Sequence, residues 1–269
     1  MVRRRRPSAA PSWRPLQRNR ELAWDGCLNV RDLGGHRTED GSETKYGAVV
    51  RADSVRQLTD EGWEALVGYD IATVVDLRGD HEREADADPP AGLPVELVHV
   101  PFMESDERGW EEIEEEVEAA ANAAPDVATA TRDVYLIFLE HFKANVAAGI
   151  RTVAQAHEGG VVVHCVGGKD RTGLLTAFLL HVAGVDTEQI AADYALSEER
   201  LRPRHEAWFA EAATDEELER LQRIAQTPAE SLVGVFEELG RRYGSVECYL
   251  REAGVSDNDF ARVRARLRG

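Results

Sequence analysis

The feature that most constrains the fold is a strand-to-helix turn within residues 161–180, VVVHCVGGKDRTGLLTAFLL. The β-branched run before the turn predicts a strand that is buried on both faces. The long apolar run after the turn predicts a buried helix, and Gly167 and Gly168 allow a tight loop between the two. The segment therefore predicts a short loop, from Cys165 to Arg171, that joins a core strand to a core helix.

The same alternation of strands and helices extends over the first two thirds of the chain. Short β-branched runs that predict strands lie at 47–53, 71–79, 95–101 and 160–165. Because most of these runs lack a polar residue at every second position, we expect the strands to be buried. Helical patterns separate them, and Thr59 is placed to cap the first helix. This order predicts an α/β fold with a largely parallel central sheet flanked by helices.

After Gly184 the pattern is helical to the end of the chain. Side chains that commonly begin a helix stand at Asp186 or Thr187, near Thr214, near Thr227 and at Ser256. No further β-branched run interrupts them. The sequence therefore predicts a C-terminal helical layer on the α/β domain.

Composition and charge exclude several classes of protein. The chain has 269 residues, of which 43% are hydrophobic and 30% charged, as expected for one soluble globular domain with additions. No apolar run approaches the roughly 18 residues that a membrane span needs, so we expect no stable membrane insertion. A net charge of −18 would repel a polyanion, so we expect no nucleic-acid partner.

The N-terminal segment and the cysteines bear on the cellular compartment. Residues 1–20 contain seven arginines, three prolines and no acidic residue, which predicts a disordered basic tail before a single domain at 21–269. The arginines are followed by PSAAPSWRP instead of an apolar segment, which makes a poor export signal. The three cysteines are widely spaced without a CxxC pair, which fits a reduced compartment and no zinc site. We therefore expect a cytoplasmic protein.

The loop from Cys165 to Arg171 has the features of an anion-binding site. A loop that runs into a helix N-terminus can turn several backbone N–H groups toward one point, where the helix dipole also favours an anion. Cys165 would lie beneath that anion, and the same field favours its nucleophilic thiolate form. The planar guanidinium of Arg171 can bind two phosphoryl oxygens. The backbone that would bind the phosphoryl group belongs to Val166, Gly167, Gly168 and Lys169.

Two residues that flank the loop each have two plausible roles. The hydroxyl of Thr172 could hydrogen-bond the sulfur when it leaves in a second step, or it could serve the helix start. His164 could orient the loop through a ring hydrogen bond, or it could be a core histidine without a part in the reaction. The sequence leaves both pairs of roles open.

Other loops that use phosphate or a thiol fit the spacing less well. A Walker-type loop needs glycine where Val163 stands and Ser or Thr where Asp170 stands, which excludes it. A rhodanese-like sulfur carrier also uses a loop cysteine, but its loop is shorter and would not need Arg171. The spacing thus favours phosphoryl transfer to Cys165.

The segments HCVGGKDRTG (164–173) and NVRDLGG (29–35) match two motifs of one known family. The first resembles the H-C-x-x-G-K-D-R-T-G signature of the atypical bacterial tyrosine and dual-specificity phosphatases at every fixed position. The second is similar to the family's N-x-R-D-L-G-G element, and the resemblance extends over nearly the whole chain from about residue 22. Val30, in place of the commoner phenylalanine, and Ala52-Asp53, in place of Ser-Gly-like residues, depart from the family pattern. These departures would change the shape of the substrate pocket.

The resemblance implies a cysteine-phosphatase fold and hydrolysis of phosphomonoesters through a phosphocysteine intermediate, without a metal or another cofactor. It also implies that Cys165 is the nucleophile and that Arg171 binds the phosphate. The family includes members that act on phosphotyrosine, phosphoserine or phosphothreonine, and phosphoinositides. We expect a protein tyrosine phosphatase, dual specificity included, that acts on phosphorylated proteins. The alternatives are a phosphoinositide phosphatase with the same loop and a catalytically silent phosphate-binding module.

The leaving oxygen of the substrate needs a proton donor within hydrogen-bond reach, and three aspartates are candidates. Asp170 lies inside the loop, where repulsion from a bound phosphate dianion favours the protonated carboxyl, and the resemblance favours it as well. Asp76 ends a predicted strand at the edge where ligands bind in open parallel sheets, although a salt bridge to Arg78 or Arg31 would also explain it. Asp106 lies in a segment that could form a separate movable loop. We expect Asp170 to be the donor, with Asp76 as the alternative.

Residues outside the loop are predicted to support it. Asn29 and Arg31 could brace the loop or contact the substrate. Lys169 is one of three lysines in the chain and adds a second cation that suits substrates with several phosphates, or it tunes the field around phosphotyrosine. The resemblance suggests a helical lid at 198–226, for which a plain pair of surface helices is the alternative.

Overall fold

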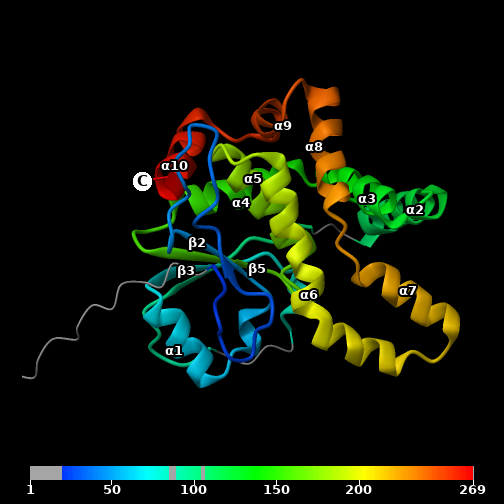
Figure 1. Ribbon diagram of the computed structural model, residues 1–269, viewed down its shortest axis with the longest axis horizontal. Helices are drawn as coiled ribbons and strands as arrows, with labels where there is room; N and C mark the ends of the chain where they lie inside the picture. The colour runs from blue at the N-terminus through cyan, green and yellow to red at the C-terminus, as the bar shows by residue number, and fades with distance from the viewer. Residues whose placement is uncertain (1–19, 85–88, 104–106, 269) are drawn as a thin grey trace, which may run out of the picture.

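The computed structural model describes residues 20–84, 89–103 and 107–268. The predicted basic tail therefore lies almost entirely outside the described residues, as does Asp106. The described chain forms a five-stranded sheet with helices on both faces (Figure 1). The strands are β1 (Arg31–Asp32), β2 (Val49–Ala52), β3 (Ile71–Asp76), β4 (Glu96–His99) and β5 (Gly160–His164).

Ten α-helices and two short 3-10 helices connect and cover these strands in the described ranges. The 3-10 helices are η1 (Val55–Gln57) and η2 (Asp80–Glu82). The α-helices that precede β5 are α1 (Asp60–Gly68), α2 (Glu107–Ala123), α3 (Val127–His141) and α4 (Lys143–Gln155). The α-helices that follow β5 are α5 (Asp170–Val182), α6 (Thr187–Glu211), α7 (Asp215–Ala225), α8 (Ala229–Tyr243), α9 (Val246–Ala253) and α10 (Asp257–Arg268).

The sheet order is β1-β2-β5-β3-β4, with β1 antiparallel and the other four strands parallel. The four predicted strands and the largely parallel sheet are thus confirmed. The expectation of full burial is wrong for β4, because this strand lies at the edge of the sheet and leaves Leu97 47% exposed. Because the parallel strands share one direction, the segments that follow β2, β3, β4 and β5 meet at one edge, where such sheets bind ligands.

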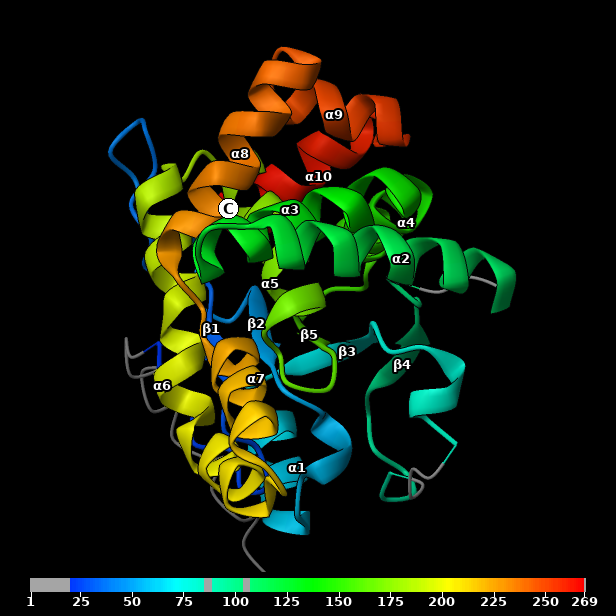
Figure 2. The same cartoon turned by 90° about the vertical axis from the view of Figure 1, so that its right-hand side faces the viewer.

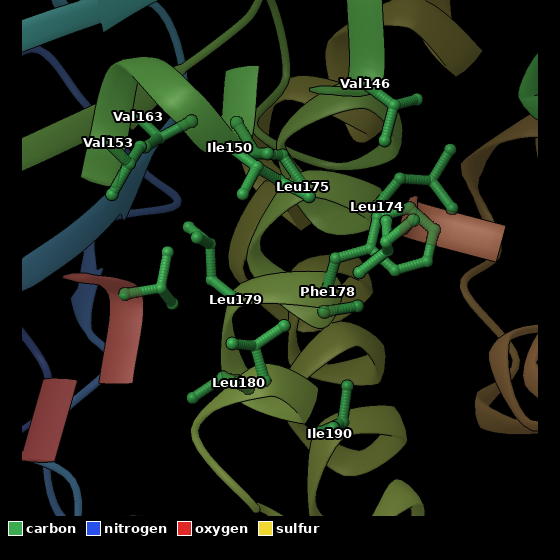
Figure 3. Packing of buried hydrophobic residues seen from close by; sticks show 14 of the residues in the cluster. Val146, Ile150, Val153, Val163, Leu174, Leu175, Phe178, Leu179, Leu180 and Ile190 are labelled. Carbon is green, nitrogen blue, oxygen red and sulfur yellow. The ribbon is translucent and has the colours of Figure 1, made fainter. Parts of the chain in front are cut away.

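The two faces of the sheet pack into two separate apolar clusters, which explains the continuous valine run before the loop. Val161 and Val163 of β5 pack into the larger cluster, with side chains of α4 and α5 that point toward one another in Figure 3. Val162 points the other way and packs against α1. Successive strand residues alternate between faces, so a strand covered on both sides needs an apolar residue at every position.

The C-terminal half is helical, as predicted. The side chains of Asp186 and Thr214 cap α6 and α7, and Thr59 caps α1. Ser256 and Asp259 exchange hydrogen bonds at the start of α10, as a capping box does. The helices α6 and α7 form a hairpin beside the sheet (Figures 1 and 2). None of the described helices combines the length and the apolar character that a bilayer crossing demands.

Candidate active site

The predicted loop lies at the carboxyl edge of the central strand. Cys165 directly follows β5 and is only 2% exposed, and α5 begins at Asp170 with Lys169 as its N-cap residue. The N-terminus of a long buried helix is thus aimed at the loop. Its unpaired N–H groups and its dipole favour an anion at this position.

Three successive carbonyl oxygens of the loop accept hydrogen bonds from residues outside it. The pairs are Val166 O with Ser54 N at 3.0 Å, Gly167 O with Asn29 Nδ2 at 2.9 Å, and Gly168 O with Arg51 Nη2 at 2.8 Å. In a planar trans peptide, the N–H group points opposite to the carbonyl of the same peptide unit. The next three N–H groups therefore point to the inner side of the loop, which is the geometry of an anion cradle.

Gly168 has the backbone conformation that makes this turn possible. Its φ is +64°, in the region that L side chains rarely adopt, and a Cβ atom there would lie 2.4 Å from the carbonyl oxygen of Ala52. Glycine alone tolerates both the conformation and the close approach. Gly167 has no such constraint, because a Cβ atom there would meet nothing closer than 3.7 Å.

Asn29 and Arg31 brace the loop from behind. The Asn29 side chain is fully buried, donates to Gly167 O and accepts from Arg31 Nη1 at 2.6 Å. Arg31 is 1% exposed, and its guanidinium also donates to Asp193 and to Ser197 of α6. Of the two roles that the sequence left open, these contacts favour the brace, because the side chains hydrogen-bond to the carbonyls of the loop and to α6.

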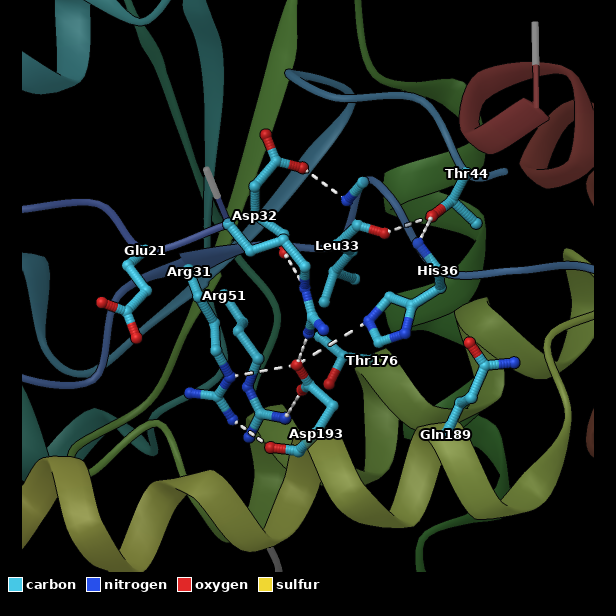
Figure 4. Close-up of polar contacts among 12 residues, drawn as sticks. Glu21, Arg31, Asp32, Leu33, His36, Thr44, Arg51, Thr176, Gln189 and Asp193 are labelled. Atoms are coloured by element: carbon cyan, nitrogen blue, oxygen red, sulfur yellow. Dashed lines mark hydrogen bonds and ion pairs between the residues drawn. The ribbon is translucent and has the colours of Figure 1, made fainter. Parts of the chain in front are cut away.

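Asp193 is the centre of a buried charge cluster that supports this brace (Figure 4). Its carboxylate pairs with Arg31 Nε at 3.1 Å and Arg51 Nη1 at 2.7 Å, and Arg20 and His36 also approach it. Burial alone would raise the pKa of Asp193, but the surrounding arginines hold it well below its usual range. Burial and the neighbouring Arg51 lower the pKa of Arg31 to about 9.

Arg171 closes the loop and is held by a residue that the sequence analysis did not single out. Glu82, at the end of η2, accepts Arg171 Nη2 through Oε1 at 2.7 Å and Arg171 Nη1 through Oε2. Burial opposes both charges, yet their pairing lowers the pKa of Glu82 and raises that of Arg171. The guanidinium therefore remains a cation with a fixed plane at the mouth of the loop.

Asp170 lies in the first turn of α5 with its side chain 46% exposed. Its Oδ1 accepts a hydrogen bond of 2.6 Å from the buried hydroxyl of Tyr135, and Lys169 Nζ lies 3.5 Å from the same oxygen. The carboxyl is thus anchored on one side while it stays open to a ligand in the loop. This is the arrangement that a proton donor requires.

Asp76 ends β3 at the same edge of the sheet, as predicted, but its carboxylate is occupied by arginines. Oδ1 accepts from Arg78 Nε at 3.0 Å, Oδ2 accepts from Arg78 Nη2 at 2.8 Å, and Arg83 Nε lies 3.4 Å away. Although burial opposes the charge, these contacts and His164 lower the pKa of Asp76 to about 2. It therefore carries no proton to donate near neutral pH.

The two flanking residues differ in what surrounds them. His164 Nδ1 lies 3.3 Å from the carbonyl oxygen of Cys165, so the ring can orient the start of the loop. Burial lowers the pKa of His164 to about 4, which keeps the ring neutral near pH 7. The Thr172 hydroxyl is buried and has no hydrogen-bond partner among the described residues, and the cap position of α5 belongs to Lys169 instead.

Lys169 and Arg204 connect the loop to the helical hairpin. Lys169 Nζ donates to the carbonyl oxygen of Ile224 in α7 at 2.5 Å. Arg204 of α6 pairs with Asp53 at 2.6 Å and donates to Val166 O at 3.3 Å. The segment predicted as a lid therefore contacts the loop on both sides.

The two departures from the family pattern do not shape a pocket in the way the sequence suggested. Val30 and Ala52 are fully buried in the apolar cluster against α1. Asp53 is also fully buried, and it accepts the backbone amide of Asn29 at 2.9 Å besides the Arg204 pair. These residues support the loop from below and do not face a ligand.

Arg51, Asp193 and Glu82 were missed in the sequence analysis, and of these only Arg51 gives a recognisable signal in the sequence. Arg51 interrupts the otherwise apolar strand VVRA, and an arginine in a buried strand indicates a buried partner. Glu82, by contrast, is one charge among many in RGDHERE, and nothing in the pattern selects it. Within the described ranges, no group of three or more His, Cys, Asp or Glu side chains is arranged to hold a metal ion.

Comparison with known proteins agrees with this geometry. The model of the tyrosine phosphatase family matches residues 22–269. The triple specificity protein phosphatase PtpB of Mycobacterium tuberculosis is 27% identical over 273 residues, which cover 91% of this chain and 98% of that protein. A tyrosine-protein phosphatase of Nostoc commune is 27% identical over 231 residues, which cover 82% of this chain and 74% of that protein. The chain therefore belongs to the tyrosine phosphatase family.

Proposed function

We propose that the chain hydrolyses phosphotyrosine in proteins by two displacements at the loop that starts at Cys165. In the first step, Cys165 Sγ attacks phosphorus, the bond from phosphorus to the phenolic oxygen breaks, and that oxygen takes a proton from Asp170. In the second step, water attacks phosphorus, the phosphorus–sulfur bond breaks, and Asp170 takes a proton from the water. The observation that carries the proposal is the row of three outward carbonyls between a buried cysteine and an arginine.

The loop residues divide the work in each step. The backbone N–H groups that follow Val166, Gly167 and Gly168 bind the equatorial oxygens, and the Arg171 guanidinium neutralises the charge that develops on them. The unpaired hydroxyl of Thr172 is available to hydrogen-bond the sulfur when it leaves. A buried hydroxyl without a partner costs stability, so a role in the second step would explain its retention.

Asp170 is the better proton donor than Asp76 on two grounds. The Asp76 carboxylate is held by Arg78 and has a pKa of about 2, so it is ionised at any pH where the enzyme would work. Asp170 has one oxygen anchored by Tyr135 and keeps about half of its side chain accessible. An accessible carboxyl next to a bound phosphate is favoured in its protonated form by like-charge repulsion.

Exposed apolar residues next to the loop favour an aromatic phosphate ester. Val166 in the loop, Leu28 beside Asn29, and Ile224 beside the Lys169 contact are three of the large hydrophobic side chains that remain exposed in the described ranges. A phenyl ring offers such side chains apolar area, whereas a phosphoserine offers almost none. Dual specificity stays within the proposal, because one relative is named a triple specificity phosphatase. The names of the relatives favour protein substrates over the phosphoinositide alternative.

The remaining parts of the proposal concern organisation. We treat 21–269 as one phosphatase domain, supported by the family match at 22–269. We treat 198–226, the C-terminal half of α6 with α7, as a lid, supported by the contacts of Arg204 and Lys169 with the two ends of the loop. We propose that the chain acts on phosphorylated proteins in the cytoplasm; the unpaired cysteines support the compartment, because they suit a reducing environment.

One set of assays tests the reaction. Purified protein with a chelator present should release phosphate from p-nitrophenyl phosphate and from a phosphotyrosine peptide, and more slowly from a phosphothreonine peptide or phosphoinositide vesicles. Cys165→Ser should abolish turnover, whereas Cys248→Ser, which changes an exposed cysteine, should not. If the parent protein and Cys165→Ser both bind the phosphotyrosine peptide and neither releases phosphate, the chain is instead the catalytically silent module.

A further inference from the structure

Three helices bring together a chain of hydroxyl groups that ends on Asp170. Tyr135 of α3 donates to Asp170 Oδ1 at 2.6 Å, and the hydroxyl of Tyr194 of α6 lies 2.9 Å from that of Tyr135. The two rings meet edge to face, with centroids 6.2 Å apart. Both tyrosines are at most 2% exposed, so the bond between their hydroxyls is shielded from water, and the bond to Asp170 is partly buried. Partly shielded hydrogen bonds to a charged group are stronger than fully exposed ones.

The direction of these hydrogen bonds follows from the number of protons that the two hydroxyls carry. Burial and the nearby charge of Asp170 raise the pKa of Tyr135 well above its ordinary value, so its hydroxyl keeps its single proton. When that proton is donated to Asp170, Tyr135 can only accept from Tyr194. Burial likewise raises the pKa of Tyr194, which keeps it a donor. Tyr194 thus donates to Tyr135, and Tyr135 donates to Asp170.

We propose that Tyr135 is a positioning residue for the proton donor. By occupying Oδ1 it leaves Oδ2 as the oxygen that carries the proton toward the leaving group. After the transfer, the same hydrogen bond stabilises the carboxylate that remains, so the donor gives up its proton more readily. This inference rests on the proposed role of Asp170.

Other ionisable groups near Asp170 would stay in place without the Tyr135 hydroxyl. Lys169 Nζ lies 3.5 Å from Oδ1, and Arg171 and His205 lie within electrostatic reach. The cations favour the ionised carboxyl as Tyr135 does, and a bound phosphate favours the protonated one. The Tyr135 hydrogen bond is therefore one of several contacts on the Asp170 carboxyl, and its loss leaves the others in place.

The test is Tyr135→Phe, which removes the hydroxyl and keeps the ring. With phenyl phosphate, a poor leaving group that needs the donor, kcat should fall about tenfold or more, since general acid catalysis contributes roughly 10²–10⁴-fold. With p-nitrophenyl phosphate, a good leaving group, kcat should change less than about threefold. The basic limb of the kcat/KM profile should move to higher pH, because the ionised carboxyl loses a hydrogen bond.

Tyr249→Phe is the matched control. Tyr249 is fully buried, and its hydroxyl donates to the carbonyl oxygen of Leu139 in the same helix as Tyr135, at 2.8 Å. Its loss should lower stability without any dependence on the leaving group. Tyr194→Phe should act like Tyr135→Phe but less strongly, and it replaces that variant if Tyr135→Phe does not fold.

Asp170→Asn separates this inference from the proposed function. If Asp170→Asn keeps the leaving-group dependence and the basic limb of the parent, Asp170 is not the donor, and the positioning role of Tyr135 is wrong with it, while hydrolysis at Cys165 stands or falls with the Cys165→Ser test. If Asp170→Asn increases that dependence while the foldable tyrosine variant slows both substrates equally and leaves the limb in place, only the positioning role is wrong. A Tyr135→Phe change that adds no leaving-group effect to Asp170→Asn would support it.

Discussion

The carboxylate of Glu82 accepts hydrogen bonds from both terminal nitrogens of the Arg171 guanidinium, although the two residues are 89 positions apart in the sequence. Such two-point pairing fixes the plane of the guanidinium as well as its place. The phosphate-binding arginine is therefore oriented before a substrate arrives. Orientation that precedes binding lowers the free energy that the substrate must supply.

Glu82→Gln should lower kcat/KM for p-nitrophenyl phosphate by about tenfold to a hundredfold, because the amide has one acceptor oxygen in place of two and a small misplacement of a catalytic group is costly. Inhibition by inorganic phosphate should weaken in parallel. Steady-state kinetics with phosphate as inhibitor measure both effects. Glu238→Gln is the control, since Glu238 pairs with Arg241 through both oxygens on the exposed face of α8. Equal kinetics for the two variants would show that the pairing does not orient Arg171.

Gly168→Ala should destabilise the protein and inactivate the loop. The positive φ alone costs an alanine about 1–2 kcal/mol, and the 2.4 Å approach to Ala52 O forces the loop or β2 to move. Urea unfolding and kcat measure the two consequences. Gly41→Ala separates them, because Gly41 has a φ of +83° but open space around its Cβ position. We expect Gly41→Ala to lose about 1 kcal/mol and no activity, and full activity in Gly168→Ala would contradict the cradle geometry.

The core of the fold and the loop could be predicted because their signals are local. Val161, Val162 and Val163 alternate between two covered faces, so an apolar residue at every consecutive position predicts their burial. Cys165 and Arg171 stand a fixed number of residues apart on one short loop, and the glycines between them allow a tight turn.

The supporting network could not be predicted because its contacts are distant in sequence. Arg51 and Asp193 are 142 positions apart and meet only because the fold brings α6 next to Arg51 of β2. Asp193 lies in the segment AADYA, and its flanking residues do not predict that it forms ion pairs with three arginines. The burial of β4 was misjudged for a related reason, since sequence does not tell which strand ends at the edge of the sheet.

Asp193→Asn should be strongly destabilising. The change keeps the size of the side chain but leaves Arg31 and Arg51 buried side by side without a counter-charge, which typically costs about 3–5 kcal/mol. Urea unfolding at pH 7 measures the loss. Asp186→Asn, at the exposed cap of the same helix, should change stability by less than about 0.5 kcal/mol because asparagine caps as well as aspartate. Similar losses for both would show that Asp193 does not hold the arginines.

His164 makes stability depend on pH in a defined window. In the unfolded chain its pKa is near 6.5, whereas burial lowers the pKa in the folded protein to about 4. Between these values the unfolded chain binds a proton that the folded protein does not, so acid favours unfolding. The depressed pKa of Asp76, about 2, acts below about pH 3.8 and stays outside this window.

Replacing His164 with asparagine should remove this acid sensitivity. Between pH 7 and pH 4 the parent should lose about 3 kcal/mol of unfolding free energy more than His164→Asn does, from a shift of about 2.5 units. Urea unfolding across this range gives the difference, and shifts in other buried histidines such as His205 are shared by both proteins and cancel. His157→Asn, at an exposed position, should follow the parent curve. Parallel curves for the parent and His164→Asn would mean that His164 is not held neutral by burial, and the fixed ring that orients Cys165 would have to be abandoned.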